Sequence, residues 1–545
     1  MATDGGTFVL VLHTHLPYVL RHGRWPHGSE WLSQATARCY LPLLAALQRL
    51  QRDRVPVKIT VNVSPILAEQ WVDPEFGGEV VRYLEAQHRA ASEDLAEFTR
   101  EGRSAEARLA QWWLRRFEEL QEQWRIIKGD LAGAFRDRRD AGQIEIITCA
   151  ATHAYLPLLT CSDSIRLQLA QAMRSHERIF GSRPKGIWLP ECAYRPGLER
   201  YLEEAGFGFF FGDMSLLSGP SFSFSSWQMM GGAQVHLPSR PERRDEFLSR
   251  PFEPCWVGPS RRVAVFLRDP KASQQVWSRE GGYPGDQWYL EFHKKRSPGG
   301  IEYWRVTDPK ADLAVKELYE PERAASQAAD HARHFAGIMA ADLAARAGSV
   351  CCAPYDTELF GHWWSEGPLW IEHLFREFAR RGVALATASE ALEGRSAAEA
   401  VTLAEGSWGD GGDHRVWRNG DTEWMWDHLK NSERAAFDAL SHLGPDPLGE
   451  RLGAQILREL VLLQSSDWPF LVTTRSARDY AERRFIVHRE SLDKLVMMAQ
   501  ALGVSGASLS RQEQRQLEVM EKTDRVFDDI GLAWRSLRDR KGSRK

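Results

Sequence analysis

The stretch TFVLVLHTH, residues 7–15, is a short apolar run that ends in a pair of histidines. Seven further runs of this kind follow along the chain: VKITVNVSP, IEIITCAATH, GIWLPE, FGFFFGD, VAVFLRD, SVCCAPYDTE and GVALATASE. A short, nearly uninterrupted apolar run is typical of a parallel strand that is buried on both faces. Most of the runs are followed by a helix-like stretch, and this repeated alternation predicts a parallel α/β barrel.

Polar residues gather where these predicted strands end. They are His15, His153, Glu191, Asp213, Asp269 and Asp356. In α/β barrels the chemistry takes place in the loops that follow the C-terminal ends of the strands. The sequence therefore predicts an active site at this end of the barrel.

The length of 545 residues predicts more than one domain. We expect a catalytic barrel over residues 1–395 and a C-terminal helical domain over 396–545 that contributes to the substrate groove. Within the barrel, residues 78–138 have the composition of a long helical insert. Residues 214–310 are largely irregular and rich in Ser, Pro and Gly, which is typical of a lid or a binding loop.

The composition excludes several classes of protein. The 70 basic and 74 acidic residues nearly cancel, so no basic field for nucleic acid is expected. The seven cysteines form no CxxC pair, which argues against a structural zinc site and favours a reducing compartment. His13 and His15 interrupt the apolar N-terminal run, which has no basic leader. We therefore expect a cytoplasmic protein that does not contact a membrane.

Two carboxylates are candidates for catalysis. Glu191 ends the run GIWLPE, and Asp356 lies near the end of SVCCAPYDTE. Two carboxyl groups on different strands of one barrel can face each other across its mouth, as glycoside hydrolysis requires. The alternative is that both are loop residues paired with arginines.

The histidines allow more than one interpretation. His13, His15 and His153, completed by a carboxylate, resemble a metal-binding set of the kind found in metal-dependent deacylases and amidohydrolases. Neutral imidazoles can equally donate hydrogen bonds to sugar hydroxyls, and a single histidine can simply belong to the core. The spacing does not decide between these alternatives.

The tryptophans favour a sugar substrate. Many of the 21 lie in GHWWSEGPLW, GSWGDGGDHRVWRNGDTEWMW and SSDWPF. Indole rings stack on the apolar faces of sugar rings, and a neutral polymer suits a chain with little net charge. Trp408 and Trp417, which lie among Gly and Asp residues, are better candidates than Trp112 and Trp113 within a predicted helix.

Five segments together resemble glycoside hydrolase family 57, and within it the 1,4-α-glucan branching enzymes. They are HTHLPYV, ATHAYLPLL, WLPECAYRPGLE, APYDTELFGHWWSEGPLW and LQSSDWPFLV with ARDYAERRF. The resemblance implies a distorted (β/α)7 barrel with helical insertions and a C-terminal all-α domain. It also implies a retaining reaction on an α-glucan that needs neither metal nor cofactor. The product of such transfer is an α-1,6 branch.

Residue by residue, the resemblance implies specific roles. Glu191 matches the nucleophile, and Asp356 matches the general acid/base. The predicted substrate-binding residues are His13, His15, His153, Trp277, Trp408, Trp417 and Asp467.

One stretch departs from the family. Branching enzymes of this family carry a tyrosine on a lid over the active site, whereas SGPSFSFSSWQMMGGAQVHLPS has none. Trp227 is the candidate substitute. An altered lid leaves open an amylase-like hydrolase, because water must be kept from the covalent intermediate for transfer to occur. A catalytically silent glucan-binding protein is a further alternative. We expect a monomer or a weak oligomer.

Overall fold

The computed structural model describes residues 5–217, 253–278, 281–393, 400–503 and 508–542. Trp227, the predicted lid residue, lies outside the described residues. The strands are β1 Thr7–Thr14, β2 Ile59–Val63, β3 Ile144–Cys149, β4 Gly186–Trp188, β5 Phe209–Gly212, β6 Cys255–Val257, β7 Val263–Leu267, β8 Val350–Asp356, β9 Ala384–Leu385 and β10 Ala400–Val401.

A run of parallel strands forms the centre of the molecule. Neighbouring strands follow the order β7-β5-β4-β3-β2-β1-β8, and every pair in this order is parallel. The two ends of the run meet at a parallel bridge between Arg268 and Cys352, where the amide of Asp269 donates to the carbonyl of Cys352 at 2.8 Å. The predicted distorted (β/α)7 barrel is therefore confirmed.

The remaining strands depart from a simple barrel. β6 is antiparallel to β7 and pairs with β10, so the sheet continues beyond β7. The last predicted run forms only the two-residue β9, which lies beside Thr7 and Phe8 of β1. This strand is short because Gly382 ends one helix just before it and Thr387 caps the next just after it.

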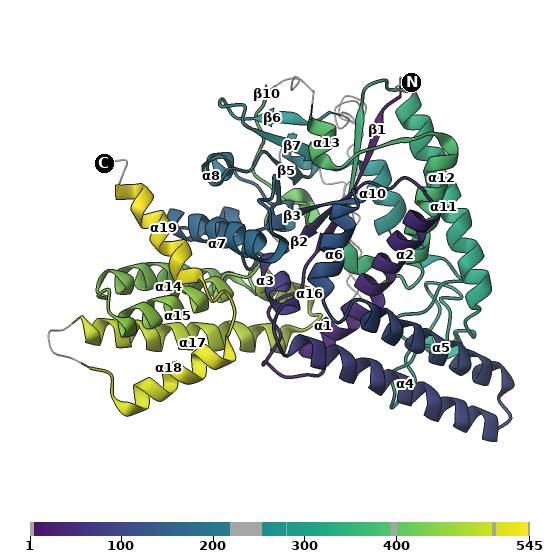
Figure 1. Cartoon of the computed structure of the whole chain (residues 1–545), viewed down its shortest axis with the longest axis horizontal. Helices are drawn as coiled ribbons and strands as arrows, with labels where there is room; N and C mark the ends of the chain where they lie inside the picture. The colour runs from purple at the N-terminus through teal and green to yellow at the C-terminus, as the bar shows by residue number, and fades with distance from the viewer. Residues whose placement is uncertain (1–4, 218–252, 279–280, 394–399, 504–507, 543–545) are drawn as a thin grey trace.

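Helices surround the strands (Figure 1). They are α1 Ser29–Ala35, α2 Leu41–Arg52, α3 Pro65–Trp71, α4 Phe76–Arg100, α5 Ser104–Ile126, α6 Leu131–Asp140, α7 Ser162–Phe180, α8 Leu198–Ala205, α10 Pro270–Trp277, α11 Pro321–Ala344, α12 Gly367–Arg381, α13 Ala388–Leu392, α14 Glu423–Ser441, α15 Pro447–Leu463, α16 Asp467–Thr474, α17 Arg478–Leu502, α18 Arg511–Thr523 and α19 Ile530–Gly542. In Figure 1, α4 and α5 form a long pair at the lower right, and α14, α15, α17 and α18 pack together at the lower left.

The segment between α15 and α16 joins the C-terminal helices to the strand ends. Ser465 forms an antiparallel bridge with Ala154, and the amide of Ser466 donates to the carbonyl of His153 at 3.0 Å. Buried side chains add a hydrogen bond of 2.9 Å from Gln168 to Gln464. These contacts bring residues 296 to 313 positions apart in the sequence to one end of the barrel.

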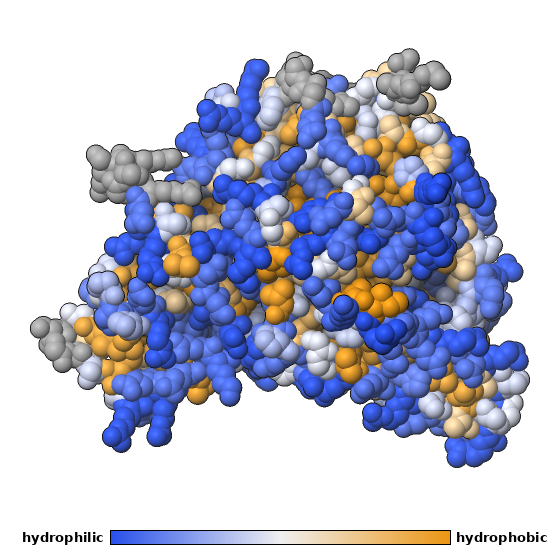
Figure 2. All heavy atoms as spheres, viewed as in Figure 1, coloured by the Kyte–Doolittle hydropathy of each residue, from blue (hydrophilic) through white to orange (hydrophobic). Residues whose placement is uncertain are grey.

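The core follows from the apolar runs. In β1 every residue from Phe8 to Thr14 is buried, as expected for a strand covered on both faces. On the face seen in Figure 2, hydrophilic side chains cover most of the surface. None of the described helices combines the length and the apolar composition that a membrane span requires.

Candidate active site

Glu191 lies in a strained turn directly after β4. Its backbone has φ 62° and ψ 23°, and Cys192 has φ 48°. Left-handed backbone at residues other than glycine costs free energy and persists where the surrounding structure imposes it, often at active sites. Here the carbonyl of Glu191 accepts a hydrogen bond of 3.1 Å from the amide of Trp408. A distant segment therefore holds the turn that presents this carboxylate.

The Glu191 carboxylate accepts hydrogen bonds at both oxygens. Oε2 accepts from Nε1 of Trp408 at 2.9 Å, and Oε1 lies 3.1 Å from the hydroxyl of Ser466. Burial raises the pKa of Glu191 to about 7, against the lowering effect of these two hydrogen bonds, and the charge of Asp467 raises it further. At neutral pH the Trp408 and Ser466 donors therefore favour the ionised form that a nucleophile needs.

Asp356 ends β8 and lies in register with His13 of β1. Burial raises the pKa of Asp356 well above its ordinary value, and the charges of Glu358 and Glu191 raise it further. Ionisation of Glu191 therefore strengthens the hold of Asp356 on its proton. The surroundings of the two carboxyl groups therefore favour opposite protonation states, the division that a nucleophile and a general acid require.

A buried chain of hydrogen bonds leads to Glu191. His13 Nδ1 lies 2.6 Å from Asn62, and its Nε2 lies 3.0 Å from Nε2 of His153. His153 Nδ1 lies 2.8 Å from the hydroxyl of Ser466, which contacts Glu191. Burial lowers the pKa of both imidazoles well below the ordinary value, so each ring carries one N–H.

The charge on Glu191 sets the direction of this chain. The single hydroxyl proton of Ser466 can be donated to an ionised Glu191 only if Ser466 accepts from His153 Nδ1–H. His153 Nε2 must then accept from His13 Nε2–H, which leaves His13 Nδ1 without a proton although it faces Oδ1 of Asn62, an acceptor, at 2.6 Å. This direction therefore requires the Asn62 amide to be turned, so that Nδ2, which has no hydrogen-bond partner among the described residues, donates to His13 Nδ1. The two histidines thereby link the charge state of Glu191 to the interior of the barrel.

His15 belongs to a neighbouring set of contacts. Its Nδ1 lies 2.8 Å from the hydroxyl of Ser64, and its Nε2 lies 3.0 Å from Asp467. Its ring stacks on that of His153 with centroids 4.0 Å apart. Ligand atoms of His15, His153 and Asp467 lie within 4.8 Å of one another, close enough to share a metal ion. However, all four imidazole nitrogens already have hydrogen-bond partners in the protein.

The predicted tryptophans occupy different depths. Trp408 is 3 % exposed, and the rings of Trp188 and Trp277 pack edge-on against it at 5.1 and 6.1 Å. Trp277 lies at the end of α10 and is only partly buried. Trp417 is 1 % exposed and packs against Tyr155 with centroids 4.8 Å apart. Trp417 therefore supports the wall of the site, whereas Trp408 contacts Glu191 directly.

Sequence analysis missed residues that shape the two carboxylates. Ser466 is the neighbour of the predicted Asp467 in SSDWPF, and Glu358 follows Asp356 by two positions, so proximity in sequence was the available signal. Burial raises the pKa of Glu358 to about 7, and its Oε1 accepts from the Tyr40 hydroxyl at 2.6 Å. Arg268, the neighbour of Asp269 in the run VAVFLRD, was missed as well, and its charge lowers the pKa of Asp356.

Two sequence profiles of known protein families match the chain. The sequence profile described as glycosyl hydrolase family 57 matches residues 9–404. The chain belongs to this family. A second profile, described as the C-terminal region of 1,4-alpha-glucan branching enzymes, matches residues 428–534.

Several known proteins resemble the chain over nearly its whole length. A 1,4-alpha-glucan branching enzyme of Thermococcus kodakarensis is 38% identical over 96% of this chain and 78% of its own. The crystal structure of a family 57 branching enzyme from Pyrococcus horikoshii matches with a TM-score of 0.87 at 35% identity, covering 98% of this chain and 97% of its own. The structure of an alpha-amylase from Thermotoga maritima matches with a TM-score of 0.80 at 29% identity, covering 97% and 99%.

Proposed function

We propose that the chain is a retaining 1,4-α-glucan branching enzyme, with Glu191 as the nucleophile and Asp356 as the general acid/base. The observation that supports these roles is the pair of buried carboxyl groups at the ends of β4 and β8, whose environments favour opposite protonation states. The similarity to branching enzymes over nearly the whole chain supports the reaction.

In the first step, Asp356 donates its proton to the oxygen of an α-1,4 bond while Glu191 attacks the anomeric carbon. The glycosidic bond breaks, the shortened chain leaves with a new hydroxyl, and the transferred chain becomes an ester of Glu191. Ester formation removes the negative charge of Glu191, which is one of the causes that raise the pKa of Asp356. The pKa of Asp356 therefore falls, which suits its change from acid to base.

In the second step, Asp356 takes the proton of a glucan 6-hydroxyl, whose oxygen attacks the anomeric carbon and releases Glu191. The product is an α-1,6 branch, and each transfer makes no net change in the number of reducing ends. Attack by water would instead leave one new reducing end for each bond cleaved.

The assignment of Glu191 is tested by trapping the intermediate. A fluorinated maltosyl fluoride, which forms the ester quickly and loses it slowly, is incubated with the protein before peptide mass spectrometry. We expect the added sugar on the peptide that contains Glu191. Labelling of Glu358 or Asp467 instead would overturn the assignment.

A second candidate function is hydrolysis of α-1,4-glucans by the same residues. The similarity to an alpha-amylase over nearly the full length of both chains favours it. A count of new reducing ends at least equal to that of new branches would establish hydrolysis as the main reaction.

We infer that the partner is a neutral α-glucan polysaccharide rather than nucleic acid or a membrane, which the net charge of -4 supports. We also infer a cytoplasmic protein, because all seven cysteines are free thiols.

We further infer that the protein acts as a monomer or weak oligomer, and that residues 396–545 complete the substrate groove. Size-exclusion chromatography with light scattering measures the oligomeric state.

A further inference from the structure

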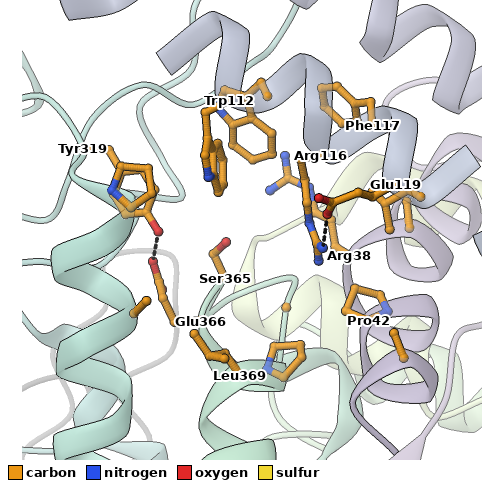
Figure 3. Close-up of a pocket in the computed structure, with 18 of the residues that line it drawn as sticks. Arg38, Pro42, Trp112, Arg116, Phe117, Glu119, Tyr319, Ser365, Glu366 and Leu369 are labelled. Atoms are coloured by element: carbon orange, nitrogen blue, oxygen red, sulfur yellow. Dashed lines mark hydrogen bonds and ion pairs between the residues drawn. The ribbon is translucent and has the colours of Figure 1, made fainter. Parts of the chain in front are cut away.

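A second pocket lies apart from the carboxylates, between α5, the short π-helix Thr36–Tyr40 and the start of α12 (Figure 3). It has a volume of about 310 Å³, enough for one or two sugar rings. Figure 3 shows Trp112 above the hollow, Ser365 and Glu366 below it, and Arg116 beside it. Among the described residues that line it, none belongs to the carboxylate site.

Trp112 offers the pocket an aromatic surface. It is partly exposed, and its neighbours Trp113 and Tyr319 lie at 4.7 and 5.8 Å with interplanar angles of 74° and 69°. Neither neighbour therefore stacks in parallel on the indole. An indole beside a hollow of this size is suited to stacking against the apolar face of a sugar ring.

Glu366 lines the pocket and carries a buried polar atom that is unsatisfied. It is 5 % exposed, and its Oε1 accepts from the Tyr319 hydroxyl at 2.7 Å and from the Leu290 amide at 3.1 Å. Its Oε2 has no hydrogen-bond partner among the described residues. A buried polar atom without a partner is costly, so a ligand hydroxyl at this position would gain a strong hydrogen bond.

The charges around the pocket favour a neutral ligand. Each of the three lining arginines already has a carboxylate partner; the pairs are Arg38–Glu302 at 2.6 Å, Arg49–Glu372 at 2.7 Å and Arg116–Glu119 at 3.4 Å. No surplus positive charge therefore faces the hollow from these residues, and the Glu366 carboxyl opposes an anion. A ligand that combines hydroxyl groups with an apolar ring face fits all of these features.

We propose that this pocket is a second binding site for an α-glucan chain, with Trp112 as the stacking surface and Glu366 Oε2 as a hydroxyl acceptor. The choice of an α-glucan as the sugar rests on the proposed function. The pocket is connected to the carboxylate site through the π-helix: Arg38 lines the pocket, while Tyr40 of the same helix donates to Glu358, two residues from Asp356.

The test is native electrophoresis in gels containing glycogen, with the Glu191→Gln variant as the parent so that no glycogen is consumed. Trp112→Ala is expected to raise the dissociation constant about tenfold, the loss of one sugar-stacking ring. Glu366→Gln, which keeps the indole and replaces the acceptor Oε2 by an NH2 group, is expected to raise it about threefold. The control is Trp304→Ala, since Trp304 is also half-buried but lies outside the pocket with Lys294 over its ring.

The outcomes separate this proposal from the proposed function. Weaker retardation of both pocket variants, with Trp304→Ala equal to the parent, supports the second site. Equal retardation of all the variants overturns the second site and leaves the proposed function intact. A parent that glycogen does not retard overturns both. Thermal melting identifies any variant that fails to fold, and Glu366→Gln decides the outcome if Trp112→Ala does.

Discussion

Replacing Trp408 by phenylalanine should shift the pH dependence of catalysis towards alkaline pH. The substitution removes the Nε1–H that donates to Glu191 Oε2 at 2.9 Å and keeps an aromatic ring against Trp188. This hydrogen bond favours the ionised carboxylate, so its loss raises the pKa of Glu191. The nucleophile then requires a higher pH to become ionised.

The size of the shift follows from the charge on the acceptor. A hydrogen bond to a charged group contributes about 1.5–3 kcal/mol, which corresponds to about 1–2 pKa units. Starting from a pKa of about 7, the ionised fraction of Glu191 at pH 7 should fall by roughly 5- to 50-fold. The activity at pH 7 should fall by the same factor and recover in part as the pH rises.

The assay is kcat/KM for branching of amylose, measured from pH 5 to 10. Trp417→Phe is the matched control, because Trp417 is equally buried and its Nε1 has no hydrogen-bond partner within the described part of the chain. We expect the acidic limb of the kcat/KM profile of Trp417→Phe to coincide with that of the wild type. A Trp408→Phe enzyme that loses activity equally at every pH would refute the electrostatic argument and leave only a packing role.

Three other changes test separate parts of the structure. Glu358→Gln removes a charge that raises the pKa of Asp356, so the alkaline limb of the rate profile should move down by about one pH unit; an unmoved limb would contradict the coupling. Activity should survive dialysis against EDTA, because hydrogen bonds already occupy the ring nitrogens of His15 and His153, and a loss restored by a metal would show the opposite. Burial alone would raise the pKa of Glu291, but hydrogen bonds from His293 and the charge of a buried lysine favour the ionised carboxylate and lower its pKa to about 2. This stabilisation is complete above the unfolded pKa of about 4.3 and is lost as the pH falls through 2, so Glu291→Gln should destabilise by ~3 kcal/mol at pH 7 and by only ~0.4 kcal/mol at pH 2. Thermal melting at both pH values measures it.

The sequence predicted the parts of the site that depend on local patterns. An apolar run followed by a polar residue marks both the strand and the end at which chemistry occurs, so the pattern alone places Glu191 just after β4 and Asp356 at the end of β8. The run at residues 7–15 corresponds to β1, which is buried almost throughout. A strand that is buried on both faces requires apolar residues at nearly every position, so a continuous apolar run is a strong sequence signal for such a strand.

Contacts between distant segments could not be predicted in this way. Trp408 and Trp417 lie in one Gly- and Asp-rich stretch, and only tertiary packing directs the first to Glu191 and the second to Tyr155. The left-handed backbone of Glu191 has no signature in its residue type. Ser466 reaches the site through pairing with the β3 loop, which is 313 residues away at His153.

The central claim is transfer of a glucan chain through Glu191, and amylose tests it most directly. Purified protein is incubated with amylose without added metal, and new α-1,6 linkages, counted after debranching, are compared with new reducing ends in the same sample. The account predicts many branches with few reducing ends for the wild type, and neither product for Glu191→Gln. Mostly reducing ends from the wild type, or branches from the variant, would contradict it.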